Sequence, residues 1–380
     1  MYRHATVLRH NRRVRVPLWR VLPVVLMTAF YWLGLSTWFY QDDFGWLAVR
    51  RDIHGWADLL PALFAPKAHG NMRPLSETGF FTLFGWLFGL NPLPFRIWVF
   101  ATQAAALLLL GDIVHRLTRS RPAAFWAQIL WAANCGFAVV MCWTSIYNQA
   151  LCGFFLLLAF RSLLRYLETG GRRWWYAQWA AFLAGFGALE TAVVYPALAA
   201  SYTWFAARKH FRHTFPMFAV SAAYAVMHFI AAPPPGGVYA MHPDLSMAAT
   251  FRTYWTMALG PDRLAAVQHV PAWAVALATA ALTAAVALLL WRVRAAWLGI
   301  AWFVIPLAPF LPLRDHVMDY YLAVPAIGLG MLGGWGVAAA WRSGIPAKAA
   351  ALLAIGLYLG FSLPASHAVD RKSTRLNSSH

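Results

Sequence analysis

The chain has 380 residues, of which 61% are hydrophobic and only 12% are charged, and its formal net charge is +18. Soluble domains average about 25% charged residues, so this chain cannot cover a water-facing surface of the usual extent. It also contains 21 tryptophans, a residue enriched where lipid meets water. The composition indicates an all-α polytopic membrane protein. It excludes a soluble enzyme, a disordered chain and a β-barrel of short alternating strands.

The positive charge does not indicate nucleic acid as a partner. The bases separate apolar runs instead of gathering on one domain, which is typical of the positive-inside pattern of membrane proteins. The cysteines Cys135, Cys142 and Cys152 lie in or beside apolar runs, without the spacing of a zinc site or a disulfide framework. We interpret them as small buried side chains.

The N-terminal segment is rich in arginine and precedes an apolar run over residues 21–39. This resembles a signal peptide, but no small-residue cleavage site follows. We therefore predict an uncleaved signal anchor with its N-terminus in the cytoplasm.

A long outer segment, residues 40–94, follows the first span. Within it, residues 76–90 are apolar but number only about fifteen, fewer than the roughly 20 that a span needs. If they crossed the bilayer, the three arginines that follow the next run (Arg116, Arg119 and Arg121) would face outside. Because positive charge favours the cytoplasmic side, we predict an interfacial helix at 76–90 instead.

The same rule gives about eleven transmembrane helices in one domain, residues 1–370. A second long outer segment covers 234–270, and residues 371–380 read as a non-native tail. Most acids then fall outside, with Asp112 and Glu168 as the inner exceptions. Asp112 and Arg116 are interpreted as an intrahelical pair and nothing more. The predicted spans are 21–39, 95–113, 123–142, 147–165, 175–189, 191–207, 216–233, 271–291, 296–312, 319–340 and 347–364.

Asp42 and Asp43 directly follow the first span. Adjacent carboxylates repel each other, and partial burial raises the pKa of at least one, as a general base requires. Such a pair also suits a divalent cation. On the dipeptide alone, two solvated residues that end a helix are the more common case.

Other polar candidates lie at the same outer level. Arg73, before Pro74, suits a bidentate phosphate contact, with a lipid headgroup as the equal alternative. Arg314 belongs to a charged group that also reads as a surface ion pair. Glu190 lies at the tip of a short hairpin, where it also reads as a helix cap. Asp319 and Tyr320 lie within about a turn of lipid depth, where ionisable groups are usually functional.

Taken in order, these segments resemble a known family. Asp42-Asp43 opens the first outer loop, Arg73-Pro74-Leu75 continues it, and the runs Leu189 to Pro196 and Tyr320 to Gly328 come later. The ordered set is similar to the GT-C membrane glycosyltransferases, nearest the branch of protein O-mannosyltransferases and lipid A aminoarabinose transferases (glycosyltransferase family 39). The likeness extends over about residues 15–340, and no single motif in it is specific.

The resemblance implies a multi-pass enzyme with a long first outer loop that contains interfacial helices. Such an enzyme moves sugar from a polyprenyl-phosphate donor to a hydroxyl of a protein or glycolipid, with inversion, at the outer face of the bilayer. It implies Asp42 as the base and Asp43 as its orienting partner. Arg73 and Arg314 would hold the donor phosphate, with Glu190, Asp319 and Tyr320 in support.

One departure concerns metal. Relatives often carry a second acid in the loop before the fourth span, whereas residues 144–149 here contain no carboxylate. We therefore predict no cofactor and no tightly bound metal, with a divalent cation as the alternative. A ligase or polymerase of lipid-linked glycans, a transporter or flippase, and a non-catalytic scaffold stay open as other functions. Richness in alanine and arginine is typical of GC-rich bacteria and favours the inner membrane.

Overall fold

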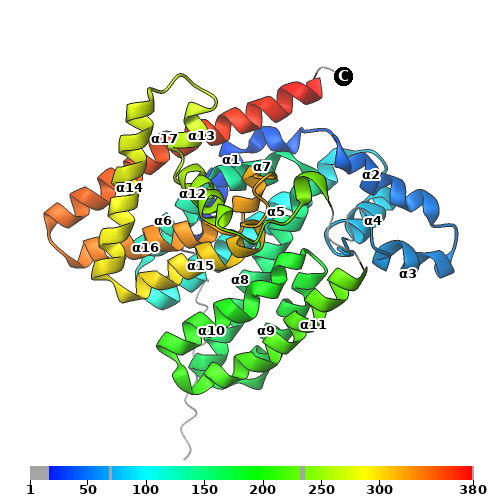
Figure 1. Cartoon of the computed structure of the whole chain (residues 1–380), viewed down its shortest axis with the longest axis horizontal. Helices are drawn as coiled ribbons and strands as arrows, with labels where there is room; N and C mark the ends of the chain where they lie inside the picture. Colours follow the sequence, from blue (N-terminus) through cyan, green and yellow to red (C-terminus); the bar gives the residue numbers. More distant parts are fainter. Residues whose placement is uncertain (1–16, 68–70, 232–235, 379–380) are drawn as a thin grey trace, which may run out of the picture.

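The computed structural model describes residues 17–67, 71–231 and 236–378, and every regular element in these ranges is a helix (Figure 1). The α-helices are α1 (Leu18–Phe30), α2 (Asp42–Ala48), α3 (Trp56–Phe64), α4 (Thr78–Phe88), α5 (Pro92–Thr118), α6 (Arg121–Ala132), α7 (Cys135–Cys142), α8 (Tyr147–Thr169), α9 (Arg172–Phe186), α10 (Tyr195–Ala206), α11 (Phe215–Ala231), α12 (Ser246–Leu259), α13 (Pro261–Ala265), α14 (Ala272–Arg292), α15 (Trp297–Leu307), α16 (Ala326–Arg342) and α17 (Ile345–Ser378). Short 3₁₀ turns link them, among them η1 (Trp32–Leu35), η4 (Thr144–Ile146), η5 (Glu190–Val194), η6 (Arg208–Thr214) and η10 (Asp319–Leu322). The predicted all-α class is confirmed.

Membrane-spanning potential is confined to fewer helices than the sequence predicts. Among the described residues, five helices are long and apolar enough to cross a bilayer, or six if the bent pair α6–α7 counts as one span. The predicted count of about eleven is not confirmed. The single helices that qualify are α5, α8 with its preceding η4 turn, α11 with its preceding η6 turn, α14 and the part of α17 up to Ala368.

The other predicted runs fold into helices that are too short. α1, α9, α10, α15 and α16 have 13, 15, 12, 11 and 17 residues, against the roughly 20 that a span needs. Much of their apolar surface packs against other helices. For example, α16 is buried along most of its length, against α6 and α15. Hydropathy alone cannot separate a lipid-facing helix from one that is buried by other helices.

The predicted span 123–142 is broken in the middle. α6 and α7 meet at an angle of 63°, and Asn134 lies at the break. Its amide oxygen accepts from the Gly136 backbone N–H at 3.0 Å, which caps α7, and its amide nitrogen donates to the Ala258 carbonyl and the Tyr358 hydroxyl. The side chain thus replaces backbone hydrogen bonds that the bend removes.

Close helix packing explains one of the glycines in α16. A Cβ on Gly328 would collide with the backbone of Gly299 and Phe303 in α15, so only glycine allows the two helices to approach this closely. Nearby, Trp302 of α15 contacts Phe160 of α8 edge-on, with ring centroids 5.3 Å apart, and both rings are fully buried. The buried core draws on α5, α6, α7, α8, α10, α15 and α16.

The two predicted outer segments fold into short helices. Residues 40–94 form α2, α3 and α4, which project to the right of the bundle in Figure 1. The predicted interfacial helix at 76–90 coincides with α4, so its helical state is confirmed. The segment 234–270 forms α12 and α13, although its first two residues lie outside the described ranges, as does the basic stretch before residue 17.

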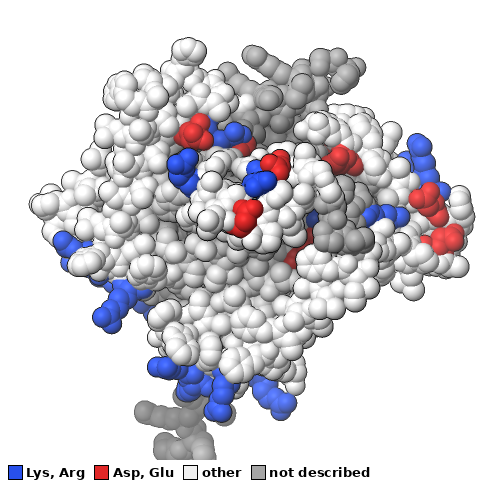
Figure 2. Space-filling view, viewed as in Figure 1, with Lys and Arg blue, Asp and Glu red and all other residues white. Residues whose placement is uncertain are grey.

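On the face that Figure 2 shows, the acidic side chains are not spread evenly. In Figure 2 the lower end, below α9 and α10, carries only Lys and Arg, whereas the visible Asp and Glu lie in the upper half and centre. α17 continues to Ser378, so the predicted non-native tail is largely helical. The three cysteines are buried and form no disulfide with one another, as the sequence predicts.

Candidate functional site

A cavity of about 680 Å³ opens at the end of the bundle where α2 and α4 lie. Its walls come from segments far apart in the sequence: α2, the loop before α4, the α7–α8 connection, η5, α11 and the segment around η10. The polar side chains that line it include Asp42, Lys67, Arg73, Glu77, Ser145, Asn148, Gln149, Glu190, Tyr224, His228 and Tyr320. Apolar rings such as Trp46, Phe310 and Tyr321 fill the spaces between them.

The aspartate pair is divided by the wall of this cavity. Asp42 is exposed and lines the cavity, whereas Asp43, the next residue, is fully buried behind it. Asp43 accepts hydrogen bonds from the Ser145 hydroxyl and from the Tyr40 backbone N–H at 3.0 Å. Burial raises the pKa of Asp43 to about 6, against the opposing effect of these donors and of the Arg96 charge.

A strained residue immediately precedes the pair. Gln41 has φ 50° and ψ −118°, in the left-handed half of the map that residues with a Cβ rarely adopt. This turn reverses the chain between Tyr40 and Asp42, and the bond from the Tyr40 N–H to Asp43 closes it. Asp43 therefore fixes the start of α2 and the direction in which Asp42 faces.

Arg73 is held between two carboxylates. Its Nε and Nη2 bind the Glu190 carboxylate at 2.7–3.0 Å, and its Nη1 contacts Glu77 Oε1 at 2.5 Å. Asn148 donates a further bond to Glu77 Oε1 at 2.8 Å. Arg73 and Glu190, which are 117 positions apart in the sequence, are thus in direct contact. The charged triad of Arg73, Glu77 and Glu190 has a net charge of −1 when both acids are ionised.

The pKa values of the two acids of the triad are shifted in opposite directions. For Glu77, burial raises the pKa above its ordinary value, and the effect outweighs the attraction of Arg73. For Glu190, burial acts in the same direction, but the bidentate contact with Arg73 outweighs it and the pKa falls below its ordinary value. Glu190 is therefore the acid that stays ionised beside Arg73 to lower pH. Glu77 is the acid that accepts a proton first as the pH falls.

The cavity wall also carries unsatisfied polar atoms. Five buried side-chain atoms that belong to lining residues have no hydrogen-bond partner in the described part of the chain: Trp143 Nε1, Asn148 Oδ1, Gln149 Oε1, Tyr224 Oη and His228 Nδ1. Buried polar groups in folded proteins are almost always hydrogen-bonded. These five atoms are buried within the wall, whereas the polar side chains that line the cavity include donors and acceptors, which suits a ligand with many hydroxyl groups.

The structure brings together only some of the predicted site residues. Asp42, Arg73, Glu190 and Tyr320 line the cavity, and the Tyr320 hydroxyl lies 3.3 Å from His316 Nε2. Asp43 supports Asp42 from behind.

Two predicted residues lie apart from the cavity lining. Arg314 is 44% exposed and faces Asp244 and Asp315 at 3.7 Å, in agreement with its alternative reading as a surface pair. Asp319 forms an ion pair with Arg263. Neither side chain lines the cavity.

Sequence reasoning missed several lining residues. Lys67 lines the cavity and forms no ion pair with any described residue, but a single lysine in a loop carries no signal in the sequence. Tyr224 and His228 lie inside an apolar run, one helical turn apart, where they read as packing residues. The 144–149 stretch, which the sequence singled out for its lack of a carboxylate, contributes Ser145, Asn148 and Gln149 instead.

Within the described residues no group of three His, Cys, Asp or Glu side chains is arranged to hold a metal ion. The prediction of no tightly bound metal stays a prediction. No protein family, no curated protein and no solved structure matches this chain. In the part of the chain that the structure describes, the fold is helical, with several helices able to span a membrane and a polar cavity at an end of the bundle.

Proposed function

We propose that the protein is a membrane glycosyltransferase of the GT-C type. It moves a sugar from a polyprenyl-phosphate donor to a hydroxyl of a protein or glycolipid acceptor on the outer side of the bilayer. The observation that carries this proposal is a cavity of about 680 Å³ that polar side chains line beside an exposed aspartate. A sugar presents hydroxyl groups that donate and accept, so it complements such a wall.

In this proposal Asp42 is the general base. Its carboxylate takes the proton of the acceptor hydroxyl while the hydroxyl oxygen bonds to the anomeric carbon. The bond between that carbon and the phosphate oxygen breaks, and the polyprenyl phosphate leaves with the electron pair. A single displacement of this kind inverts the configuration. Asp43 acts as a positioning residue, since it holds the turn before α2 through Tyr40 and Ser145.

The donor phosphate requires cations in the same cavity. Arg73 and Lys67 both line it, and we assign them the phosphate contacts. Arg73 is already matched by two acids, so protonation of Glu77, whose pKa burial raises, releases part of its charge for the phosphate. Lys67 adds a positive charge with no carboxylate partner among the described residues. Arg314, whose exposed side chain faces Asp244 and Asp315 outside the cavity lining, receives no phosphate contact in this proposal.

The broken span α6–α7 is the feature that most favours transport as an alternative, since transporters use broken helices at their ion sites. An ion-coupled site, however, needs ionisable or free polar groups at the break. Residues 130–137 contain no Asp, Glu, Lys, Arg or His, and the Asn134 amide is bonded to other parts of the protein. The bend therefore supports a structural role.

A turnover assay tests the proposal. Purified protein in proteoliposomes is supplied with a panel of radiolabelled polyprenyl-phosphate sugars and an extract of envelope acceptors, and release of polyprenyl phosphate is measured. We expect turnover with one donor, and a loss of about 10²–10⁴-fold in kcat for Asp42→Asn, because a positioned base contributes about that much.

Asp52→Asn is the matched control, because Asp52 is exposed in the same outer segment and lies outside the cavity lining. It should keep full turnover. The proposal is contradicted if the protein neither hydrolyses nor transfers any donor in the panel. It is also contradicted if Asp42→Asn keeps a turnover within tenfold of the unaltered protein.

A further inference from the structure

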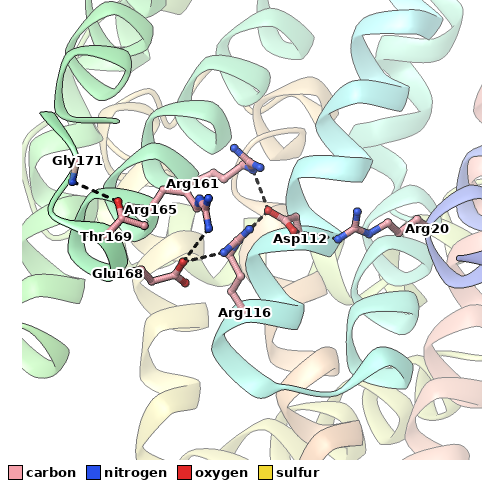
Figure 3. Close-up of polar contacts among 8 residues, drawn as sticks. All are labelled: Arg20, Asp112, Arg116, Arg161, Arg165, Glu168, Thr169 and Gly171. Carbon is pink, nitrogen blue, oxygen red and sulfur yellow. Dashed lines mark hydrogen bonds and ion pairs between the residues drawn. The ribbon is translucent and has the colours of Figure 1, made fainter. Parts of the chain in front are cut away.

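A second group of charges lies at the other end of the bundle and takes no part in the cavity. Asp112 in α5 binds Arg116 and Arg161 at 2.8 Å and Arg20 at 3.2 Å. Glu168 in α8 continues the chain, with Arg116 at 2.8 Å and Arg165 at 3.4 Å. Figure 3 shows these side chains as a row in which guanidinium and carboxylate groups alternate. The intrahelical pair of Asp112 and Arg116 that the sequence predicts is present, but the prediction that it is nothing more is wrong.

This inner arginine row, defined as Arg20, Asp112, Arg116, Arg161, Arg165 and Glu168, is not electrically balanced. Four guanidinium groups share two carboxylates, which leaves a net charge of +2. Arg165 contributes to the excess, since its one carboxylate contact is the longest in the row and its Nε is buried without a hydrogen-bond partner among the described residues.

Several guanidinium groups lie around Trp174 of α9, at one end of the row. The guanidinium carbons of Arg161, Arg165 and Arg173 lie 5.6, 5.1 and 5.2 Å from the centre of its ring. Arg173 is exposed and forms no ion pair with any described residue. Trp174 Nε1 is buried and has no partner in the same ranges. The unsatisfied atoms here, Arg165 Nε and Trp174 Nε1, are both buried donors, and the exposed positive charge beside them is that of Arg173.

The distance from the cavity places this group at the opposite membrane surface. Asn148, near the start of α8, lines the cavity, and Glu168 lies 20 residues further along the same helix. At 1.5 Å per residue the separation is about 30 Å, close to the thickness of the hydrocarbon core. Positive charge beside tryptophan at this level is typical of contact with lipid headgroups.

We propose that Arg161, Arg165 and Arg173, around Trp174, form a binding site for a phosphate group, with an anionic phospholipid of the leaflet opposite the cavity as the occupant. Guanidinium groups bind phosphate oxygens by paired, charge-assisted hydrogen bonds. Basic clusters between helices at the membrane surface bind anionic headgroups in this way. The inference does not depend on the proposed sugar transfer, because no residue of the site reaches the cavity.

Native mass spectrometry of the full chain in detergent tests the proposal, with short-chain phosphatidylglycerol as the probe and short-chain phosphatidylcholine and inorganic phosphate as comparisons. The variant is R165Q/R173Q, which keeps the Asp112 contacts and the Arg116–Glu168 pair. Each cationic contact to an anionic headgroup contributes about 1 kcal/mol. Loss of two should therefore weaken phosphatidylglycerol binding on the order of 30-fold, or about 2 kcal/mol.

The matched control is R208Q/R212Q, which removes the same charge from exposed positions of η6. Arg208 also stacks on a tryptophan, Trp204, at 4.3 Å. The control should change binding less than threefold, and circular dichroism of all variants should match the unaltered protein. Equal losses in both double variants, or equal affinity for phosphatidylcholine, overturn the proposal. If inorganic phosphate binds as tightly as the lipid and loses the same affinity in R165Q/R173Q, the phosphate site stands, and free phosphate is its occupant.

Discussion

The charged triad gives the sharpest prediction. Arg73→Gln removes the cation that faces Glu77 and Glu190 and leaves two acids, whose side chains are 3% and 20% exposed, without their cationic partner. Breaking a buried ion pair by removal of one member costs about 3–5 kcal/mol, mostly because a charge stays buried and uncompensated. We expect Arg73→Gln to lower the free energy of unfolding by this amount at neutral pH.

The assay is reversible unfolding in mixed micelles of mild detergent and dodecyl sulfate, followed by tryptophan fluorescence. Arg314→Gln is the control, because Arg314 is 44% exposed and faces its acids at 3.7 Å, so its pairs contribute about 0–1 kcal/mol. The double variant R73Q/E190Q should recover part of the lost stability, since it removes one of the two carboxylates left without a cation.

Protonation gives a second readout for Arg73→Gln. Once the cation is gone, the Glu77 and Glu190 carboxylates take up protons more readily, so the loss of stability should shrink as the pH falls towards 5. Equal losses for Arg73→Gln and Arg314→Gln, or a loss for Arg73→Gln that does not change with pH, would refute the triad as a buried, charge-coupled unit.

Three further outcomes follow from the same structure. Burial raises the pKa of Asp43 to about 6, so protonated Asp43 stabilises the fold below about pH 4 and this contribution, about 3 kcal/mol, is lost as the pH rises through 6. Asp43→Asn should flatten the pH dependence of unfolding, and an unchanged pH dependence contradicts the assignment. Gln41→Gly should stabilise the protein by about 1 kcal/mol, because glycine accepts φ 50° without strain; thermal unfolding in detergent measures this, and a loss of stability counts against strain. Gly328→Ala should cost about 1–3 kcal/mol through its clash with α15, whereas Gly336→Ala on the same helix, where a Cβ meets only Leu289 at 3.8 Å, should cost little; equal unfolding midpoints would contradict the close packing.

Part of the candidate site was visible in the sequence because two of its residues are adjacent along the chain. Asp42 and Asp43 stand out as a pair, and the prediction that one carboxyl has a raised pKa agrees with the burial of Asp43. The structure adds which of the two is buried, since Asp43 turns toward Ser145, 102 residues away. No local pattern encodes that choice.

Long-range pairing accounts for most of what the sequence missed. Arg73 reads as a phosphate ligand because its partner Glu190, 117 positions away, cannot be assigned to it from spacing, although Glu77, four residues on, could have been. Asp112 reads as a partner of Arg116, four residues away, because i,i+4 pairs are visible in a sequence and contacts with Arg20 and Arg161 are not.

The sequence by itself determined the class of the protein. Its apolar content and the spacing of its bases require helices that bury or span, because an unpaired backbone has no partner in lipid. The tertiary structure decided the rest: which apolar helices are long enough to cross, where Asn134 bends a span, and which charges meet. These depend on contacts between residues far apart in the chain, and a pattern read along one segment carries no information about the segment that packs against it.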